Sequence, residues 1–316
     1  MTDTTGSPQS ERTGAATRVA TGIIDNVEEV IVGHHAAIEH IVTALLGRGH
    51  ILLEDVPGVG KTMLARSIAA SVDGAFSRVQ FTPDLLPTDI TGVNVYNRKD
   101  ERFEFREGPI FGNVVLADEI NRAPPKTQSA LLEAMEETQV SVDGTSHAVP
   151  DPFAVVATQN TVEQHTAYDL PMAELDRFMT KLRLGYPDAD EETAMLGEVV
   201  GHHPIADLEP VATLEDLRAA RDTVATVTVE EPVRAYVTRL ARYTRENARL
   251  GVSPRGSLSL LRAAQGRAVL EGRDYVVPDD IKQEAPVVLP HRIRTDSSDR
   301  TAADLVEAAL ETVDVE

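Results

Sequence analysis

The chain has 316 residues, of which 42% are hydrophobic, and it carries a formal net charge of −21. This length accommodates one large or two modest domains, and the apolar content is sufficient for a buried core. No apolar run approaches the ~20 residues of a membrane-spanning helix. The polar residues 1–13 lack the apolar segment of a signal peptide, and the absence of cysteine excludes disulfides and thiolate metal sites. We therefore expect a cytoplasmic protein with no membrane span.

The strong negative charge restricts the kinds of partner. Only five of the 30 basic residues are lysine. A field of this sign repels nucleic acid and anionic membrane surfaces, which argues against both as partners. Two explanations of the charge remain open. We favour a surface adapted to a high-salt cytoplasm, where screening reduces self-repulsion, over the alternative of a basic protein partner.

The N-terminal part of the chain predicts a tail followed by two helices. Residues 1–16 are polar and are predicted to be a disordered tail. Apolar side chains at helical spacing then predict helices over residues 17–30 and 35–47. The short connection between these helices contains Val32 and Gly33.

A glycine-rich turn follows the apolar run at residues 50–53, which we interpret as a buried strand. The turn leads into a helical pattern, and this is the context of a phosphate-binding loop. Gly58 and Gly60 allow backbone N–H groups to face an anion, and the helix N-terminus adds partial positive charge. Lys61 is then expected to reach the β- and γ-phosphates, and the Thr62 hydroxyl to contact Mg²⁺.

One position departs from the usual motif. The pattern G-x-x-x-x-G-K-[ST] requires glycine where this chain has Asp55. The first glycine only begins the turn and does not contact phosphate, so we expect the loop to be functional. A chance match of a glycine-rich turn before a helix remains the alternative.

A second hydrophobic strand, at residues 113–117, ends in Asp118 and Glu119. Next to a phosphate-binding loop, Asp118 can hold Mg²⁺ and Glu119 can orient or deprotonate an attacking water. Between the two motifs we predict a strand at residues 76–81. The insert at residues 93–106 reads as two short strands around a turn, and it is either a solvated hairpin or a loop that contacts a partner.

Further strands and a hairpin complete the first part of the chain. A hairpin at residues 139–149 is built on Asp143-Gly144, a strong turn signal. A third buried strand at residues 153–158 is followed by Asn160, which is expected near the γ-phosphate because ligands collect at the carboxyl edge of such sheets. The alternative for Asn160 is an ordinary turn former. Arg177 precedes a last strand at residues 179–184, and on its own it would be assigned to a surface ion pair.

From residue 188 onward the pattern is entirely helical. Helices are predicted at residues 188–200, 213–225, 231–247, 254–271 and 278–289. Arg255 lies in the first turn of one of them, where a cation is electrostatically unfavourable, so we expect it to serve an anion. The expected organisation is an α/β nucleotide-binding core over residues 17–186, an all-α lid over 187–295, and an acidic helix or tail over 296–316.

The whole set of motifs resembles the MoxR family of AAA+ ATPases. The similarity covers roughly residues 17–295, and the runs that carry it are Leu53 to Thr62, Leu116 to Gln128, Ala157 to Asn160, Leu175 to Phe178, and Ser253 to Arg255. The resemblance implies a P-loop AAA+ core with a parallel sheet flanked by helices, followed by the helical lid. It also implies that Asp55 is a tolerated variant.

The resemblance assigns roles to individual residues. It implies ATP contacts from Val32 and Gly33 at the adenine and from the P-loop set Pro57, Gly58, Val59, Gly60, Lys61, Thr62 and Met63, with Mg²⁺ held by Thr62 and Asp118. Glu119 is implied as the catalytic carboxylate and Asn160 as the first sensor. Arg177 is implied as the arginine finger acting on a neighbouring subunit, and Arg255 as the second sensor.

The function that the resemblance implies is ATP hydrolysis in a ring, expected to be hexameric, that remodels or matures client proteins. A partner with a von Willebrand factor A domain is implied by the family alone. The insert at 93–106 and the hairpin at 139–149 would then face the central pore. The alternatives are a DNA-acting AAA+ motor, a metal-chelatase ATPase subunit, and a nucleotide-binding scaffold without turnover. The negative charge argues against the first, and Glu119, Asn160 and Arg255 argue against the last.

Overall fold

A parallel β-sheet carries the first part of the chain. The computed structural model describes residues 8–56, 58–160, 168, 170–199, 204–296 and 300–315. Within these residues five strands form one sheet in the order β2-β5-β8-β1-β9. Their bounds are β1 (Ile51–Asp55), β2 (Phe76–Gln80), β5 (Val114–Asp118), β8 (Ala154–Asn160) and β9 (Thr180–Leu182). The predicted sheet of parallel strands is confirmed.

Helices cover both faces of this sheet, as parallel sheets require. Ile51 and Leu53 of β1 face the hydrophobic cluster that contains helices α1, α2 and α3. Leu52 faces a second cluster together with α5. The helices of this part are α1 (Pro8–Glu28), α2 (His35–Leu46), α3 (Lys61–Ser71), α4 (Pro87–Thr91), α5 (Pro125–Glu137) and α6 (Met172–Leu175).

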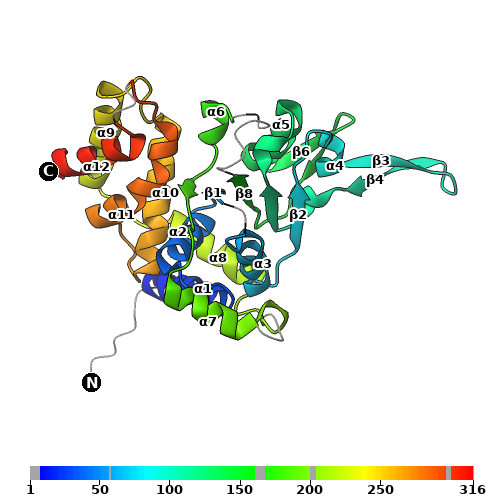
Figure 1. The fold of residues 1–316 in the computed structure, drawn as a ribbon, viewed down its shortest axis with the longest axis horizontal. Helices are drawn as coiled ribbons and strands as arrows, with labels where there is room; N and C mark the ends of the chain where they lie inside the picture. Colours follow the sequence, from blue (N-terminus) through cyan, green and yellow to red (C-terminus); the bar gives the residue numbers. More distant parts are fainter. Residues whose placement is uncertain are drawn as a thin grey trace.

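Two hairpins extend from the sheet and match the predicted positions. The first consists of β3 (Gly92–Asn97) and β4 (Arg102–Glu107), and the second of β6 (Gln139–Val142) and β7 (Thr145–Ala148). Asp143 and Gly144 both have positive φ, as the two-residue turn requires. Figure 1 shows β3 and β4 projecting from one end of the molecule, far from the C-terminal helices.

The C-terminal part is helical, as predicted. Its helices are α7 (Ala189–Val199), α8 (Leu214–Ala225), α9 (Glu231–Glu246), α10 (Pro254–Leu270), α11 (Pro278–Val288) and α12 (Ala302–Thr312), and it contains the 3-10 turns η3 (Pro204–Ala206) and η4 (Pro290–Arg292). Two further 3-10 turns, η1 (Pro109–Phe111) and η2 (Ile120–Arg122), lie in the first part of the chain, before and after β5. Thr213 caps α8 by accepting a hydrogen bond from the Asp216 N–H. None of the described helices is long and apolar enough to cross a membrane.

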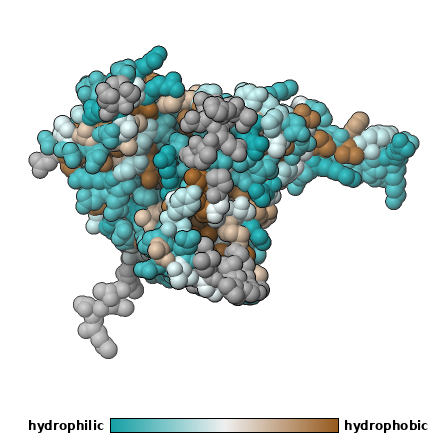
Figure 2. Space-filling view, viewed as in Figure 1, coloured by the Kyte–Doolittle hydropathy of each residue, from teal (hydrophilic) through white to brown (hydrophobic). Residues whose placement is uncertain are grey.

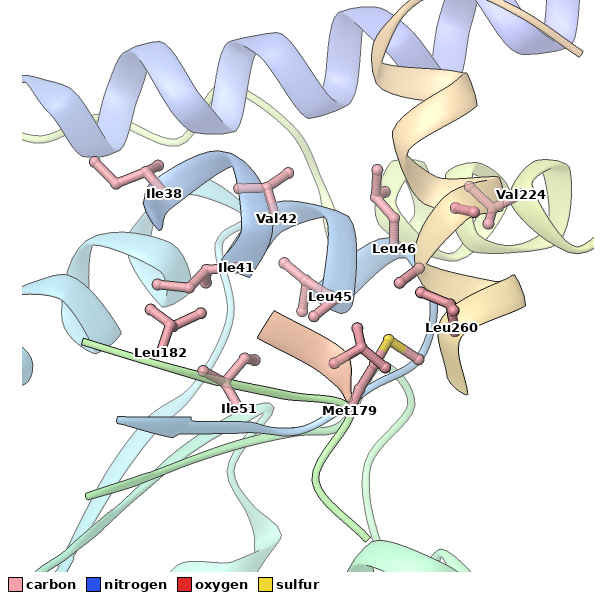
Figure 3. Packing of buried hydrophobic residues seen from close by; sticks show 14 of the residues in the cluster. Ile38, Ile41, Val42, Leu45, Leu46, Ile51, Met179, Leu182, Val224 and Leu260 are labelled. Atoms are coloured by element: carbon pink, nitrogen blue, oxygen red, sulfur yellow. The ribbon is translucent and has the colours of Figure 1, made fainter. Parts of the chain in front are cut away.

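The helical part shares a hydrophobic core with the sheet. Figure 3 shows Leu45 and Leu46 of α2 packed between Ile51 of β1, Met179 before β9, and Leu260 of α10. Because one continuous hydrophobic cluster joins these elements, we infer that the C-terminal helices pack directly against the sheet at its β9 edge.

The N-terminal helix is longer than predicted. It begins at Pro8, so the predicted disordered tail does not extend to residue 16; residues 1–7 lie outside the described residues. Ala16 and Ala20 are buried on the same face as Ile23 and Val27. Alanine is a good helix former but a weak signal of hydrophobic periodicity. The helical pattern could therefore be read only from the larger apolar side chains that follow.

Asp55, the departure from the phosphate-loop motif, joins β1 to β9. It is 5% exposed. Its Oδ2 accepts hydrogen bonds from the N–H groups of Leu184 (2.7 Å) and Gly185 (2.9 Å), and its Oδ1 accepts from the Val56 N–H (2.8 Å). Glycine could supply none of these acceptors. The carboxylate therefore fixes the start of the loop to the chain segment that leaves the sheet for the helical part.

His50 joins three elements at the opposite end of β1. Its Nδ1 accepts from the Val155 N–H of β8 (3.0 Å), and its Nε2 lies 3.2 Å from the Met135 carbonyl oxygen of α5. Both bonds are satisfied when the ring is neutral and Nε2 carries the proton. Burial lowers the pKa of His50 from 6.5 to about 4, and the nearby Arg221 adds to this effect.

Asp55→Gly, which restores the usual motif, should nevertheless destabilise the protein. Three backbone N–H groups lose their acceptor, and a buried donor left unsatisfied costs about 1–3 kcal/mol. Denaturant unfolding without nucleotide measures the change in the free energy of unfolding. Asp73→Gly is the control, because Asp73 is exposed with a φ of 50°, a backbone conformation that suits glycine. Equal stability of the two variants would show that the Asp55 carboxylate contributes nothing.

Acid should weaken the fold through His50. Above pH 6.5 the imidazole is neutral in the folded and the unfolded chain. Between pH 6.5 and about 4 only the unfolded chain gains a proton, so the free energy of unfolding falls by up to about 3 kcal/mol as the pH decreases. His50→Asn, which keeps an acceptor for Val155, should flatten this pH dependence. Parallel unfolding curves for both proteins across this range would contradict the assignment.

Candidate functional site

A cleft lies at the carboxyl edge of the sheet, where β1, β5 and β8 end. Its volume is about 220 Å³, and it is lined by Gly58, Gly60, Lys61, Thr62, Met63, Arg78, Asp118, Glu119 and Asn160. Complete ligand sites are typically about 300–1,000 Å³, so this cleft is smaller than a complete site for a whole nucleotide. Apart from Arg78, every lining residue was singled out by the sequence.

The glycine-rich loop has the backbone conformation that phosphate binding requires. Gly58 and Gly60 have φ values of 90° and 85°, a region that favours glycine. Gly60 directly precedes α3, so the helix N-terminus points at the cleft. The Lys61 Nζ donates to the carbonyl oxygens of Asp55 (3.3 Å) and Val56 (3.1 Å), which holds the ammonium group over the loop. Pro57 lies outside the described residues.

The two carboxylates after β5 are organised by a hydroxyl on the neighbouring strand. Thr158 of β8 donates from its Oγ1 to Asp118 Oδ1 (2.6 Å), and the same oxygen accepts from the Glu119 N–H (2.8 Å). Glu119 has a φ of 56°, so the chain turns sharply after Asp118. This turn lets both acidic residues line one cleft although adjacent residues of a strand point to opposite faces.

Three residues that the sequence did not single out donate hydrogen bonds to the two carboxylates, and one of them, Arg78, also lines the cleft. Arg78 of β2 donates to Asp118 Oδ2 (2.7 Å). Gln80 of β2 and Arg122 both donate to Glu119 Oε2, at 2.7 and 2.8 Å. β2 is paired with β5, so its alternate residues reach the two carboxylates. Knowledge of this pairing would have revealed Arg78 and Gln80, but the sequence alone does not give it.

The oxygen-rich end of the cleft suits a magnesium ion. Thr62, the second residue of α3, lines the cleft, and Asp118 and Glu119 supply carboxylates. Mg²⁺ binds through one or two carboxylates together with substrate phosphates and water. The donor set therefore fits Mg²⁺, which Thr62 and Asp118 would hold, and Lys61 would face the phosphates. Asn160, at the end of β8, lines the same cleft.

The residues expected at the adenine lie elsewhere. Neither Val32 nor Gly33 lines the cleft, and Val59 packs against the main hydrophobic core instead. Gly33 has a φ of 74°, and a Cβ at this position would collide with the Glu191 carboxylate of α7. The positive φ is the reason that glycine suits this position, since the end of the Glu191 side chain is flexible and could move aside. The contacts of Val32 and Gly33 with adenine stay a prediction.

Arg177 and Arg255 lie together, but not in this cleft. Both pair with the carboxylate of Glu136 in the last turn of α5, Arg177 at 3.0 Å. They line a small pocket of about 180 Å³ together with Gly49 and His50, which precede β1. This is the amino edge of the sheet, because the Met179 N–H before β9 bonds to the His50 carbonyl oxygen. The anion that the sequence predicted for Arg255 is, within this chain, Glu136.

The two sites are thus separated by the length of the strands. The cleft follows the carboxyl end of β1, and the arginine pocket precedes its amino end. At about 3.3 Å per residue, the five residues of β1 span roughly 16 Å. The resemblance implies that Arg177 acts on a neighbouring subunit and that Arg255 is the second sensor. Within one chain neither lines the cleft, and both roles stay predictions.

Comparison with known proteins agrees with the fold and the site. The family model for ATPases associated with various cellular activities (AAA) matches residues 50–180, and a model of the AAA lid domain matches residues 240–310. The uncharacterised protein YeaC of Bacillus subtilis is 52% identical over 272 residues, 85% of each chain. The chaperone MoxR1 of Mycobacterium tuberculosis is 42% identical, covering 85% of this chain and 74% of its own.

A solved structure from Cytophaga hutchinsonii, described as a candidate ATPase, superimposes with a TM-score of 0.89. It is 36% identical and covers 96% of this chain and 97% of its own. This likeness extends over the sheet and the C-terminal helices alike. With the motifs, the cleft and these relatives in agreement, the chain belongs to the MoxR family of AAA+ ATPases.

Proposed function

We propose that this protein hydrolyses ATP to ADP and phosphate in a homo-oligomeric ring and uses the turnover to remodel or mature client proteins. The observation that carries the proposal is the convergence of the P-loop, Asp118, Glu119 and Asn160 in one cleft. These groups come from three neighbouring strand ends, and together they supply phosphate binding, metal ligands and a base.

Each group in the cleft has a proposed chemical role. Lys61 and the loop N–H groups bind the β- and γ-phosphates, while Thr62 and Asp118 hold Mg²⁺. Bound Mg²⁺ neutralises charge on the phosphate oxygens. Glu119 accepts a proton from the attacking water, whose oxygen bonds to the γ-phosphorus as the bond to the ADP oxygen breaks. Asn160 positions that water.

The position of the arginines supports a ring. Arg177 and Arg255 face away from their own cleft, at the other edge of the sheet. When one subunit supplies a guanidinium group to the γ-phosphate that its neighbour binds, hydrolysis depends on assembly. We therefore propose that both arginines act on the nucleotide of the adjacent subunit, with a hexamer as the expected ring.

The projecting hairpin supports contact with a client protein. Tyr96 and Phe103 form an edge-to-face pair near its tip and are 50% and 70% exposed. Figure 2 shows hydrophobic side chains on this hairpin against a mainly hydrophilic surface. Exposed aromatic side chains are common at protein interfaces. The proposed partner with a von Willebrand factor A domain rests on family membership.

Substitution of the proposed base tests the reaction. Glu119→Gln should bind ATP normally and lose about 10²–10⁴-fold in kcat, because the amide cannot accept the proton. Steady-state ATP hydrolysis with Mg²⁺ is measured in concentrated KCl, which screens the net charge of −21. The inactive variant would also retain bound clients for identification.

Glu137→Gln is the matched control, since Glu137 is exposed on α5 and away from the cleft. It should hydrolyse ATP like the wild type. Turnover by Glu119→Gln at the wild-type rate would refute the catalytic assignment. Absence of turnover in the assembled wild type would leave a nucleotide-binding scaffold as the better function.

Arg177→Ala should retain ATP binding and lose about 10³-fold or more in kcat, the usual effect of removing an arginine finger. Nucleotide affinity, turnover and ring size are measured together. Arg242→Ala removes an exposed arginine of α9 and serves as the control. If Arg177→Ala assembles and hydrolyses ATP at a normal rate, the finger assignment is wrong.

A further inference from the structure

Glu136 is the point where three segments far apart in the sequence meet. It lies in the last turn of α5, one residue before the helix ends. Its Oε2 pairs with Arg177, which follows α6, at 3.0 Å, and its Oε1 pairs with Arg255 in the first turn of α10. A single carboxylate thus holds both arginines of the pocket, one with each oxygen.

This arrangement has an electrostatic reason. Two guanidinium groups in one small pocket repel each other, and a shared carboxylate compensates that repulsion. The side chain of Glu136 is only 34% exposed, so water screens the three charges incompletely. Removing the carboxylate should let the two arginines separate.

The backbone around the arginines is fixed independently of Glu136. Asp176 accepts hydrogen bonds from Ser253 Oγ (2.8 Å) and Arg292 Nε (2.8 Å). Asp176 precedes Arg177, and Ser253 caps the helix that carries Arg255. The two segments therefore stay side by side when Glu136 is changed, and the variant should lose side-chain order rather than the fold.

The side chains themselves have few other anchors. Arg177 Nε is buried and has no hydrogen-bond partner among the described residues. The side chain of Arg255 is 44% exposed, and the ion pair found for it among the described residues is the one with Glu136. Long flexible side chains held at one point regain rotamer freedom when that point is lost.

We propose that Glu136 is a positioning residue that joins Arg177 and Arg255 into one two-arginine unit, which is presented to the γ-phosphate of the neighbouring subunit. The inference rests on the proposed function, since it requires that these arginines act on a neighbour's nucleotide. Glu136 itself does not line the cleft. Its effect on turnover passes through the two guanidinium groups.

Three substitutions separate this role from a general effect on folding. Glu136→Ala and Glu136→Gln should each reduce kcat by about tenfold or more, because small displacements of a group that stabilises a transition state are costly. The KM for ATP should stay within about twofold, since the P-loop is intact. Glu136→Asp should restore part of the rate. Glu137→Ala, at the next and exposed position, is the control and should act like the wild type.

A double-mutant cycle tests whether the arginines act as a unit. In the wild-type background Arg255→Ala should reduce kcat by about tenfold or more, whereas in the Glu136→Ala background it should cost less than about threefold. Equal factors in the two backgrounds would overturn the proposal. So would a kcat of Glu136→Ala or Glu136→Gln equal to or above the wild-type value.

Rings assembled from two variants show whether Glu136 acts on the nucleotide site of its own subunit or on that of the neighbouring subunit. Glu136→Ala subunits keep an intact cleft, and Glu119→Gln subunits keep an intact arginine face. Equal amounts, mixed before nucleotide is added, should hydrolyse ATP faster than either variant alone, because a competent site forms where the two intact parts meet. No gain would overturn the proposal. Inactive wild-type rings would instead refute the proposed function, so the two failures are distinguishable.

Discussion

The buried ion pair between Arg292 and Asp176 is the contact on which the arrangement of the arginine pocket depends. Arg292 is 3% exposed, and burial lowers its pKa to about 10, so the guanidinium stays charged at neutral pH. A buried charge of this kind must be paired and hydrogen-bonded. Asp176 supplies the opposite charge, and the carbonyl oxygens of Phe178 and Met179 accept the remaining N–H groups. The pair thereby joins the segment before β9 to η4, the 3-10 turn that follows α11.

A parallel sheet imposes the second constraint. All strands end at one edge, so the phosphate loop and the two carboxylates after β5 meet there, and that edge is where ligands gather. The segment before β9 necessarily starts at the opposite edge, and Arg177 starts with it. Because α10 begins beside this segment, Arg255 is confined to the same edge. The separation of Glu119 from the two arginines follows from the topology, and in the proposed ring a second copy of the chain would bring them together.

This topology also explains what could be predicted from the sequence. Lys61 and Asp118 stand in continuous patterns of strand, turn and helix, so local residue types suffice to place them. Gln80 becomes visible only when β2 is paired with β5, a contact between residues 39 apart. The bond of Glu136 with Arg255 joins residues 119 apart. Helix ends were predicted well where proline or a cap marks them, and the start of α1 was not, because alanine carries little hydrophobic signal.

The cations of the cleft and of the arginine pocket locally oppose the negative charge of the whole chain. An acidic chain that binds a polyanionic nucleotide must place its cations where the phosphates lie, because the field of the whole molecule opposes their approach. Lys61 and Arg78 line the cleft, while Arg177 and Arg255 line the pocket. Concentrated salt shortens the Debye length to about 3 Å at 1 M and so reduces the general repulsion. Partly buried contacts within the cleft and the pocket are screened much less. High salt should therefore favour the approach of nucleotide and the assembly of the proposed ring while leaving the Glu136 pairs largely intact.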